Sequence, residues 1–106
     1  MEINYHSAQA LNMMTLLRQM GYHPITDYHT EQASWVRTLG RGYYPRFHLY
    51  LKQNHSTYQL SLHLDQKQHT IAVTGLKRHA GEYHGAVVEQ EAQRLQRWLQ
   101  YAETTI

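Results

Sequence analysis

Two runs of alternating residues decide the fold: Arg46-Phe47-His48-Leu49-Tyr50-Leu51-Lys52, and Ser56-Thr57-Tyr58-Gln59-Leu60-Ser61-Leu62-His63-Leu64-Asp65-Gln66. In both runs, large apolar residues alternate with polar ones. This period of two residues is typical of a β-strand with one buried face and one solvent-facing face. The polar segment between the runs, Gln53-Asn54-His55, is short enough for a hairpin loop. The pattern therefore predicts an antiparallel hairpin with Leu62 in the core and His63 on the opposite face.

Antiparallel pairing of the two apolar faces predicts which residues lie opposite each other. On the buried face, the predicted pairs are Leu49 with Leu60 and Phe47 with Leu62. On the other face, Arg46 is expected opposite His63, and His48 opposite Ser61. Asp65 shares this second face, two residues beyond His63.

The composition indicates one small globular domain over residues 1–106. Hydrophobic residues make up 42% of the chain and charged residues 17%, and a chain of this length buries enough surface to fold alone. There is no Cys, which excludes disulfides and thiolate metal sites. The sequence has neither the pattern of a secretory signal nor an apolar run of membrane-spanning length, so we expect a cytoplasmic protein without a membrane partner.

Charge is unevenly distributed along the chain. The formal net charge is +2, but the segment from Arg37 to Arg78 carries seven Lys or Arg residues and one acid, Asp65, which is a balance of +6. The chain also has nine His residues. A basic segment favours anionic partners, and a solvated surface without a partner is the alternative interpretation.

Further segments have the patterns of regular elements. Ser7 is a candidate cap for a helix that runs to Met20, and residues 86–101 form a second amphipathic helix. Residues 33–39 predict a strand, and residues 70–74 predict a short additional one. We therefore expect a two-layer α+β sandwich in the order helix, three strands, loop, helix. Its antiparallel sheet would have three or four strands, with both helices on the apolar face.

Three segments resemble the signature of a small bacterial protein family that has no assigned activity. They are Tyr44-Pro45-Arg46-Phe47-His48-Leu49-Tyr50, His63-Leu64-Asp65-Gln66-Lys67 and His79-Ala80-Gly81-Glu82-Tyr83-x-Gly85. The resemblance extends from about Trp35 to Leu95 and implies a compact cytoplasmic domain without catalytic activity. The family pattern more often has Asp at the position of His84. The resemblance therefore does not by itself support His84 as a ligand.

His and carboxylate residues after the hairpin form a candidate metal site. His63 and Asp65 share one face of a strand, and His79 and His84 follow on a Gly-flanked loop whose return would close over that face. Imidazole and carboxylate groups are ordinary ligands for zinc, iron, nickel or manganese. Their spacing matches no established zinc signature. The alternative is that His63 and Asp65 form a hydrogen bond that fastens the loop to the sheet.

A second candidate site is the basic and aromatic outer face of the hairpin with the loop that follows. Its residues are Arg46, His48, Tyr50, Lys67, Lys77 and Arg78. Arg and Lys bind phosphates, and exposed aromatic rings stack on unpaired bases. The predicted element order is similar to that of double-stranded-RNA-binding domains. Their second helix typically begins with a Lys cluster, whereas this one begins Gly85-Ala86-Val87-Val88-Glu89.

The sequence lacks the motifs of the common enzyme classes. It has no Gly-x-Ser-x-Gly elbow, no phosphate-binding Gly loop and no Cys nucleophile. Acid–base catalysis by His63 with Asp65 or Glu82 is the remaining enzymatic option. We therefore interpret the chain as a small non-catalytic binding or accessory module that uses a His/Asp/basic sheet face. Its partner would be an anionic ligand, a nucleic acid or a protein, and its candidate cofactor a divalent metal such as zinc.

Overall fold

The structure is a computed structural model that describes residues 1–26, 33–66, 81–82 and 85–104. Its elements in chain order are β1 (Glu2–His6), α1 (Met13–Gln19), β2 (His23–Thr26), β3 (Ala33–Thr38), β4 (Arg46–Asn54), β5 (Thr57–Asp65), β6 (Gly81–Glu82) and α3 (Ala86–Thr104). The predicted short strand over residues 70–74 lies outside the described residues.

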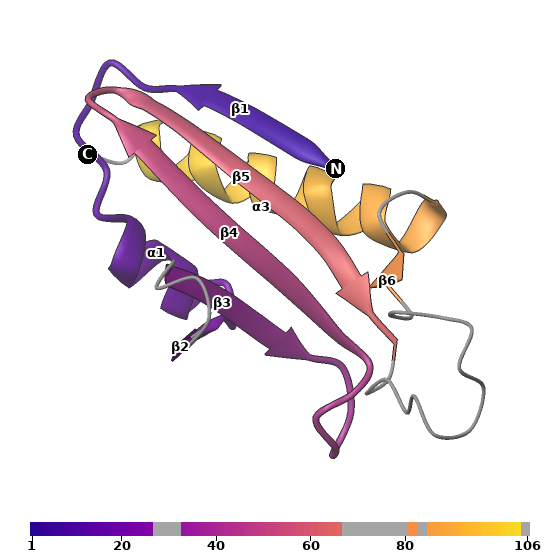
Figure 1. The fold of residues 1–106 in the computed structure, drawn as a ribbon. Coiled ribbons are helices and arrows are strands. Elements are labelled where there is room, and N and C mark those ends of the chain that lie inside the picture. The colour runs from indigo at the N-terminus through magenta and orange to yellow at the C-terminus, as the bar shows by residue number, and fades with distance from the viewer. Residues whose placement is uncertain (27–32, 67–80, 83–84, 105–106) are drawn as a thin grey trace.

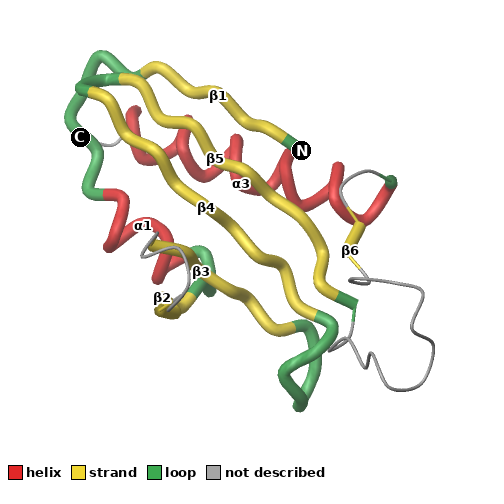
Figure 2. Tube along the Cα trace, viewed as in Figure 1, coloured by secondary structure: helices red, strands yellow, loops and turns green. Residues whose placement is uncertain are grey.

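The strands form one antiparallel sheet in the order β1-β5-β4-β3-β2, and the short β6 pairs with the end of β5. Figure 1 and Figure 2 show both helices over the same face of this sheet. The predicted α+β class is therefore confirmed. The sheet is larger than the predicted three or four strands, because β1 and β2 each add a strand at an edge.

The hairpin of β4 and β5 has the predicted faces but a different register. Leu49 pairs with Leu62 and His48 with His63, each two residues away from the predicted pairing. The connection is the two-residue turn His55-Ser56, in which His55 takes a left-handed φ of 58°. A two-residue turn fits the twist of paired strands well, and a shift of two residues leaves every side chain on its predicted face.

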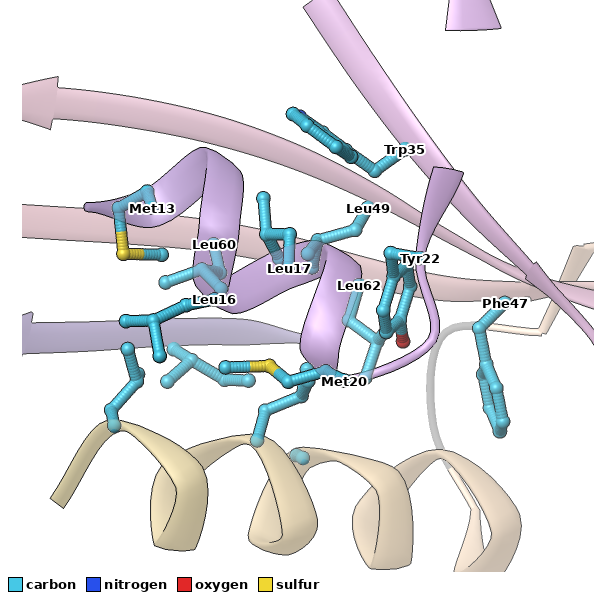
Figure 3. Close-up of a cluster of buried hydrophobic side chains, with 14 of the residues drawn as sticks. Met13, Leu16, Leu17, Met20, Tyr22, Trp35, Phe47, Leu49, Leu60 and Leu62 are labelled. Atoms are coloured by element: carbon cyan, nitrogen blue, oxygen red, sulfur yellow. The ribbon is translucent and has the colours of Figure 1, made fainter. Parts of the chain in front are cut away.

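The hydrophobic core lies between the sheet and the two helices (Figure 3). Its principal members are Phe47, Leu49, Leu60, Leu62 and Leu64 from β4 and β5, Met13, Leu17 and Met20 from α1 and its end, and Val88, Leu95 and Leu99 from α3. Leu62 is 1% exposed, which confirms its predicted place in the core. Removal of these large apolar side chains from water is the main stabilising contribution to the fold.

The N-terminal segment differs from the prediction. It begins with strand β1 at the edge of the sheet, where Ile3 and Tyr5 alternate with polar residues and pair with β5. Helix α1 starts later and is capped by Asn12 rather than by Ser7. The Asn12 side chain accepts a hydrogen bond from the Thr15 N–H at 3.2 Å, as expected of a residue that precedes the first helical turn.

Ser7 instead belongs to a junction between β1 and the end of α3. The Glu103 carboxylate accepts hydrogen bonds from the Tyr5 hydroxyl, from Ser7 Oγ at 3.1 Å and from the Ala8 N–H at 3.0 Å. The hydrogen bond to Glu103, with burial as a smaller cause, raises the pKa of Tyr5 to about 12. The junction holds the last turns of α3 against the edge strand.

The segment that follows α1 lies between the predicted helix and the predicted strand over residues 33–39, and it contains strand β2. Pro24 pairs with Trp35 of β3, and a proline is tolerated here because an edge strand has only one bonded side. Gly21 has a φ of 101°, the left-handed conformation expected of a residue that follows a helix. Tyr22 is fully buried, so this segment contributes to the core as well as to the sheet.

Helix α3 follows the predicted range and extends three residues beyond Tyr101. Its buried stripe consists of Val88, Glu91, Ala92, Leu95 and Leu99. In the described part of the chain, neither helix combines the length and the apolar character needed to cross a membrane.

One carboxylate, that of Glu91, lies inside this stripe and is only 4% exposed. Tyr22 Oη donates to Glu91 Oε2 at 2.7 Å. Arg94 donates to both carboxylate oxygens, at 2.7 Å and 2.8 Å, and Arg37 Nη1 lies 3.7 Å from Oε1. Burial, followed by the Glu91 charge, raises the pKa of Tyr22, which keeps its hydroxyl a neutral donor. The cluster therefore joins α3 to β3 and to the chain after α1.

Candidate functional site

The outer face of the sheet, opposite to α1 and α3, carries polar side chains across β4 and β5. The ladder places Arg46 directly opposite Asp65 and His48 directly opposite His63. The predicted pairs, Arg46 with His63 and His48 with Ser61, are therefore wrong by two residues. The observed register brings two imidazoles and a carboxylate together on neighbouring strands. We refer to Arg46, His48, His63 and Asp65 as the outer-face cluster.

Asp65 is the centre of the outer-face cluster. His63 Nε2 lies 2.8 Å from Asp65 Oδ1, and His48 Nδ1 lies 3.3 Å from Oδ2. Arg46 Nε donates to the same Oδ2 at 3.3 Å. The four side chains are between 12% and 21% exposed. Both carboxylate oxygens are thus engaged by groups that are largely shielded from water.

The partners of Asp65 control its ionisation. Burial by itself would raise the pKa of Asp65. Hydrogen bonds with His48 and His63, together with electrostatic attraction to these two side chains, outweigh burial and hold the pKa of Asp65 well below its usual range. The carboxylate is therefore ionised at neutral pH, which is the form that ligates metal ions or accepts hydrogen bonds from arginine.

The two imidazoles and Tyr50 pack as a group of rings. The ring centroids of His48 and Tyr50 are 4.6 Å apart, and those of His48 and His63 are 4.9 Å apart. Tyr50 and His63 are stacked with an interplanar angle of 22°. His48 Nε2 is buried and has no hydrogen-bond partner within the described residues. Unpaired buried acceptors are more common than unpaired buried N–H groups, which favours the His48 tautomer with its proton on Nδ1, toward Asp65.

Three members of the outer-face cluster have the composition of a divalent-metal site. One ligand atom from each of His48, His63 and Asp65 lies within 4.8 Å of the other two. Ligand atoms around a tetrahedral zinc ion are about 3.3 Å apart, so small side-chain movements would complete the set. Of the four predicted ligands, His63 and Asp65 lie together, whereas His79 and His84 lie outside the described residues. His48 is absent from the predicted metal set because the predicted register separates it from His63.

The predicted nucleic-acid face is described only in part. Arg46, His48 and Tyr50 lie on the outer face of β4. Three further members lie outside the described residues: Lys67, Lys77 and Arg78. Arg46 already has two partners. It forms an ion pair with Asp65, and its Cζ lies 4.7 Å from the centroid of the Tyr44 ring. The nucleic-acid interface therefore stays a prediction.

Replacing Asp65 by Asn is expected to destabilise the protein at neutral pH and to matter less in acid. The variant keeps the shape but loses the charge, and one hydrogen bond to a charged group is worth about 1.5–3 kcal/mol. Because the pKa of Asp65 is lower in the folded than in the unfolded chain, its contribution is present above the usual carboxyl pKa of about 4. That contribution is lost as the pH falls through the folded value. Urea unfolding of both proteins at about pH 7 and about pH 3 measures this change, and a difference that stays constant would contradict it.

Comparison of the chain with protein-family models, with curated proteins and with solved structures finds no match. The resemblance of the three segments to a bacterial family therefore stays a prediction.

Proposed function

We propose that this protein is a small non-catalytic binding module that holds one divalent transition-metal ion, of the zinc class, on its outer sheet face. The ligands are His48, His63 and Asp65. One observation carries the proposal: donors from two directly paired strands lie within 4.8 Å of one another. Two imidazoles and one carboxylate are a common ligand set for zinc and for other divalent first-row metals.

The surroundings of the three ligands support this function. They project from β4 and β5, two paired strands in the interior of the sheet, so their backbone positions are held by the ladder in the absence of an ion. Asp65 is ionised, and His48 has one ring nitrogen without a partner within the described part of the chain. Three protein ligands leave one coordination position for a small ligand or a partner side chain, which suits a module that responds to binding.

Arg46 is the basis of the competing interpretation. Its guanidinium lies 3.3 Å from Asp65 Oδ2, so the carboxylate is already compensated without a metal. The cluster would then be a hydrogen-bonded lock between β4 and β5. The two functions differ in how the stability of the folded protein depends on metal ions. A metal stabilises the folded protein by mass action and is removed by chelator, whereas the stability of the lock does not depend on chelator.

Zinc is expected to raise the melting temperature of chelator-treated protein, and His63→Ala is expected to abolish this effect. At a free zinc concentration 100 times Kd, the stabilisation would be about 2.7 kcal/mol. Thermal unfolding of protein without a His tag, titrated with zinc, measures the shift. Calorimetric titration of the same samples measures the stoichiometry, which we expect to be about one ion per chain.

The matched control is His6→Ala. It also removes one imidazole, but His6 pairs with Thr57, which lies six residues before His63 along β5. That separation is about 20 Å, too far for His6 to share the ion. This variant should bind zinc as the parent does. A parent melting temperature that zinc does not change would exclude the metal and leave the lock. Equal loss of binding in both variants would mean diffuse binding by the nine His residues rather than a site.

A further inference from the structure

The two helices cover unequal lengths of the sheet. Helix α1 has seven residues and α3 has 19, which correspond to about 10 Å and 28 Å, whereas the nine residues of β4 span about 30 Å. Helix α3 therefore runs past α1 along the sheet (Figure 1). In the stretch that α1 leaves open, a groove of about 440 Å³ lies between the N-terminal part of α3 and the paired ends of β3 and β4.

This groove is positively charged. Arg37, Arg94 and Arg97 line it, and Glu91 is the single carboxylate among its described lining residues. Glu91 is buried and already accepts hydrogen bonds from Tyr22 and Arg94. Arg97 is exposed and makes no ion pair with any described residue. An anion in the groove would therefore meet an excess of two positive charges, and one of these, on Arg97, has no ion-pair partner in the described part of the chain.

One wall of the groove is apolar. Figure 3 places Phe47 at one end of the core cluster, away from Met13. The Phe47 ring lies beside Arg37, whose Cζ is 5.8 Å from the ring centroid. Leu39 and Val87 also line the groove and are 43% and 47% exposed. Apolar side chains in the same groove as the Arg97 guanidinium, which has no ion-pair partner among the described residues, favour a ligand that joins an anionic head to an apolar body, because each part then meets a matching surface.

We propose that this groove binds a small organic anion, a carboxylate or phosphate monoester carried on an aromatic or aliphatic body. Arg37 and Arg97 bind the head group, since arginine recognises both kinds of oxyanion through paired N–H donors. Arg94 stays engaged, because it also donates to the Met20 carbonyl at 2.8 Å. The volume of about 440 Å³ is within the range of small-molecule sites. The groove lies on the helix-covered side of the sheet, so it is independent of the proposed metal site.

Titration with phenyl phosphate, followed by NMR, tests the site. The largest chemical-shift changes are expected at the side-chain amides of Gln90 and Gln93, which line the groove. Arg97→Gln should weaken binding about tenfold, the effect of losing one charge-assisted hydrogen bond. Inorganic phosphate has only the anionic head group and phenol only the aromatic body, so each should bind more weakly than phenyl phosphate. Benzoate in a parallel titration tells a carboxylate head from a phosphate head, and tight binding of either supports the proposal.

The matched control is Lys52→Gln, which removes one positive charge from the outer face of β4. Its distance from the groove should leave the affinity unchanged within about twofold, because exposed charges beyond a Debye length are screened. Arg97 is exposed, so its replacement should leave the melting temperature unchanged, and a loss of binding then reports on the groove rather than on folding. Absence of binding by phenyl phosphate and benzoate at millimolar concentration would overturn the proposal. Equal weakening in both variants, or shift changes that avoid Gln90 and Gln93, would overturn it too.

Discussion

Replacing Glu91 by Ala is expected to lower the free energy of unfolding by about 3–5 kcal/mol. The carboxylate is 4% exposed, and its removal would leave the Tyr22 hydroxyl without its acceptor and the Arg94 guanidinium with the Met20 carbonyl but no counter-charge from Glu91. An exposed pair with the same spacing of three residues contributes only a few tenths of a kcal/mol. The large effect follows from burial, because a charged group taken out of water is destabilising once its partner is gone.

Urea unfolding of the parent and three variants measures this effect. Glu89→Ala is the matched control, because Glu89 is exposed on the same helix, and its loss should stay within about 0.5 kcal/mol. Glu91→Gln keeps an oxygen acceptor for Tyr22 but removes the charge that pairs with Arg94, so we expect an intermediate loss. If Glu91→Ala cost no more than Glu89→Ala, the carboxylate would not be holding α3 to the sheet.

The hairpin shows which part of a fold an alternating pattern can predict. The period of two residues assigns each side chain of β4 and β5 to the correct face, but any shift by two residues preserves those faces. The register is decided by the turn, where His55 takes a positive φ and allows a two-residue connection. The predicted metal set therefore includes His63 and Asp65, which lie on one strand, and omits His48, which only the register brings to them.

The spacing of apolar residues in α3 also indicates that Glu91 is buried. Val88, Glu91, Ala92 and Leu95 have the spacing of one helix face, so Glu91 lies within the apolar stripe of α3. A charge in that position needs partners from elsewhere, and Tyr22 comes from a segment 69 residues away. Local periodicity can therefore identify the buried charge, but the groups that make its burial tolerable are set by the tertiary fold.

Local sequence patterns do not predict the edge strands β1 and β2, because these strands also depend on long-range contacts. Strand β1 has only Ile3 and Tyr5 on its inner side, and so short an alternation is compatible with either a helix or a strand. Its assignment depends on pairing with residues 57–61 of β5, a long-range contact. Strand β2 contains Pro24, which argues against a strand except at a sheet edge.

Leu62→Ala and His63→Ala are expected to have very different effects, although the two residues are neighbours on β5. Leu62 is 1% exposed and pairs with Leu49, so truncation should cost about 2–5 kcal/mol through lost burial and the cavity that remains. His63 is 13% exposed on the opposite face, and its ring nitrogen lies 2.8 Å from Asp65. Asp65 would keep its two other partners, so we expect a loss of about 1.5 kcal/mol for His63→Ala, the lower end of the range for a hydrogen bond to a charged group.

Urea unfolding of both variants in the presence of chelator measures the two losses without any contribution from a metal. Leu64→Ala provides a second core truncation on the same strand and should resemble Leu62→Ala, because Leu64 is also buried. Equal, small losses for Leu62→Ala and His63→Ala would mean that the assignment of β5 residues to the core face and the outer face is wrong. A larger loss for His63→Ala would mean that the outer-face cluster contributes more to the fold than the apolar face does. Repeating the measurement in zinc then separates the two roles of His63, since only metal binding would increase its loss under those conditions.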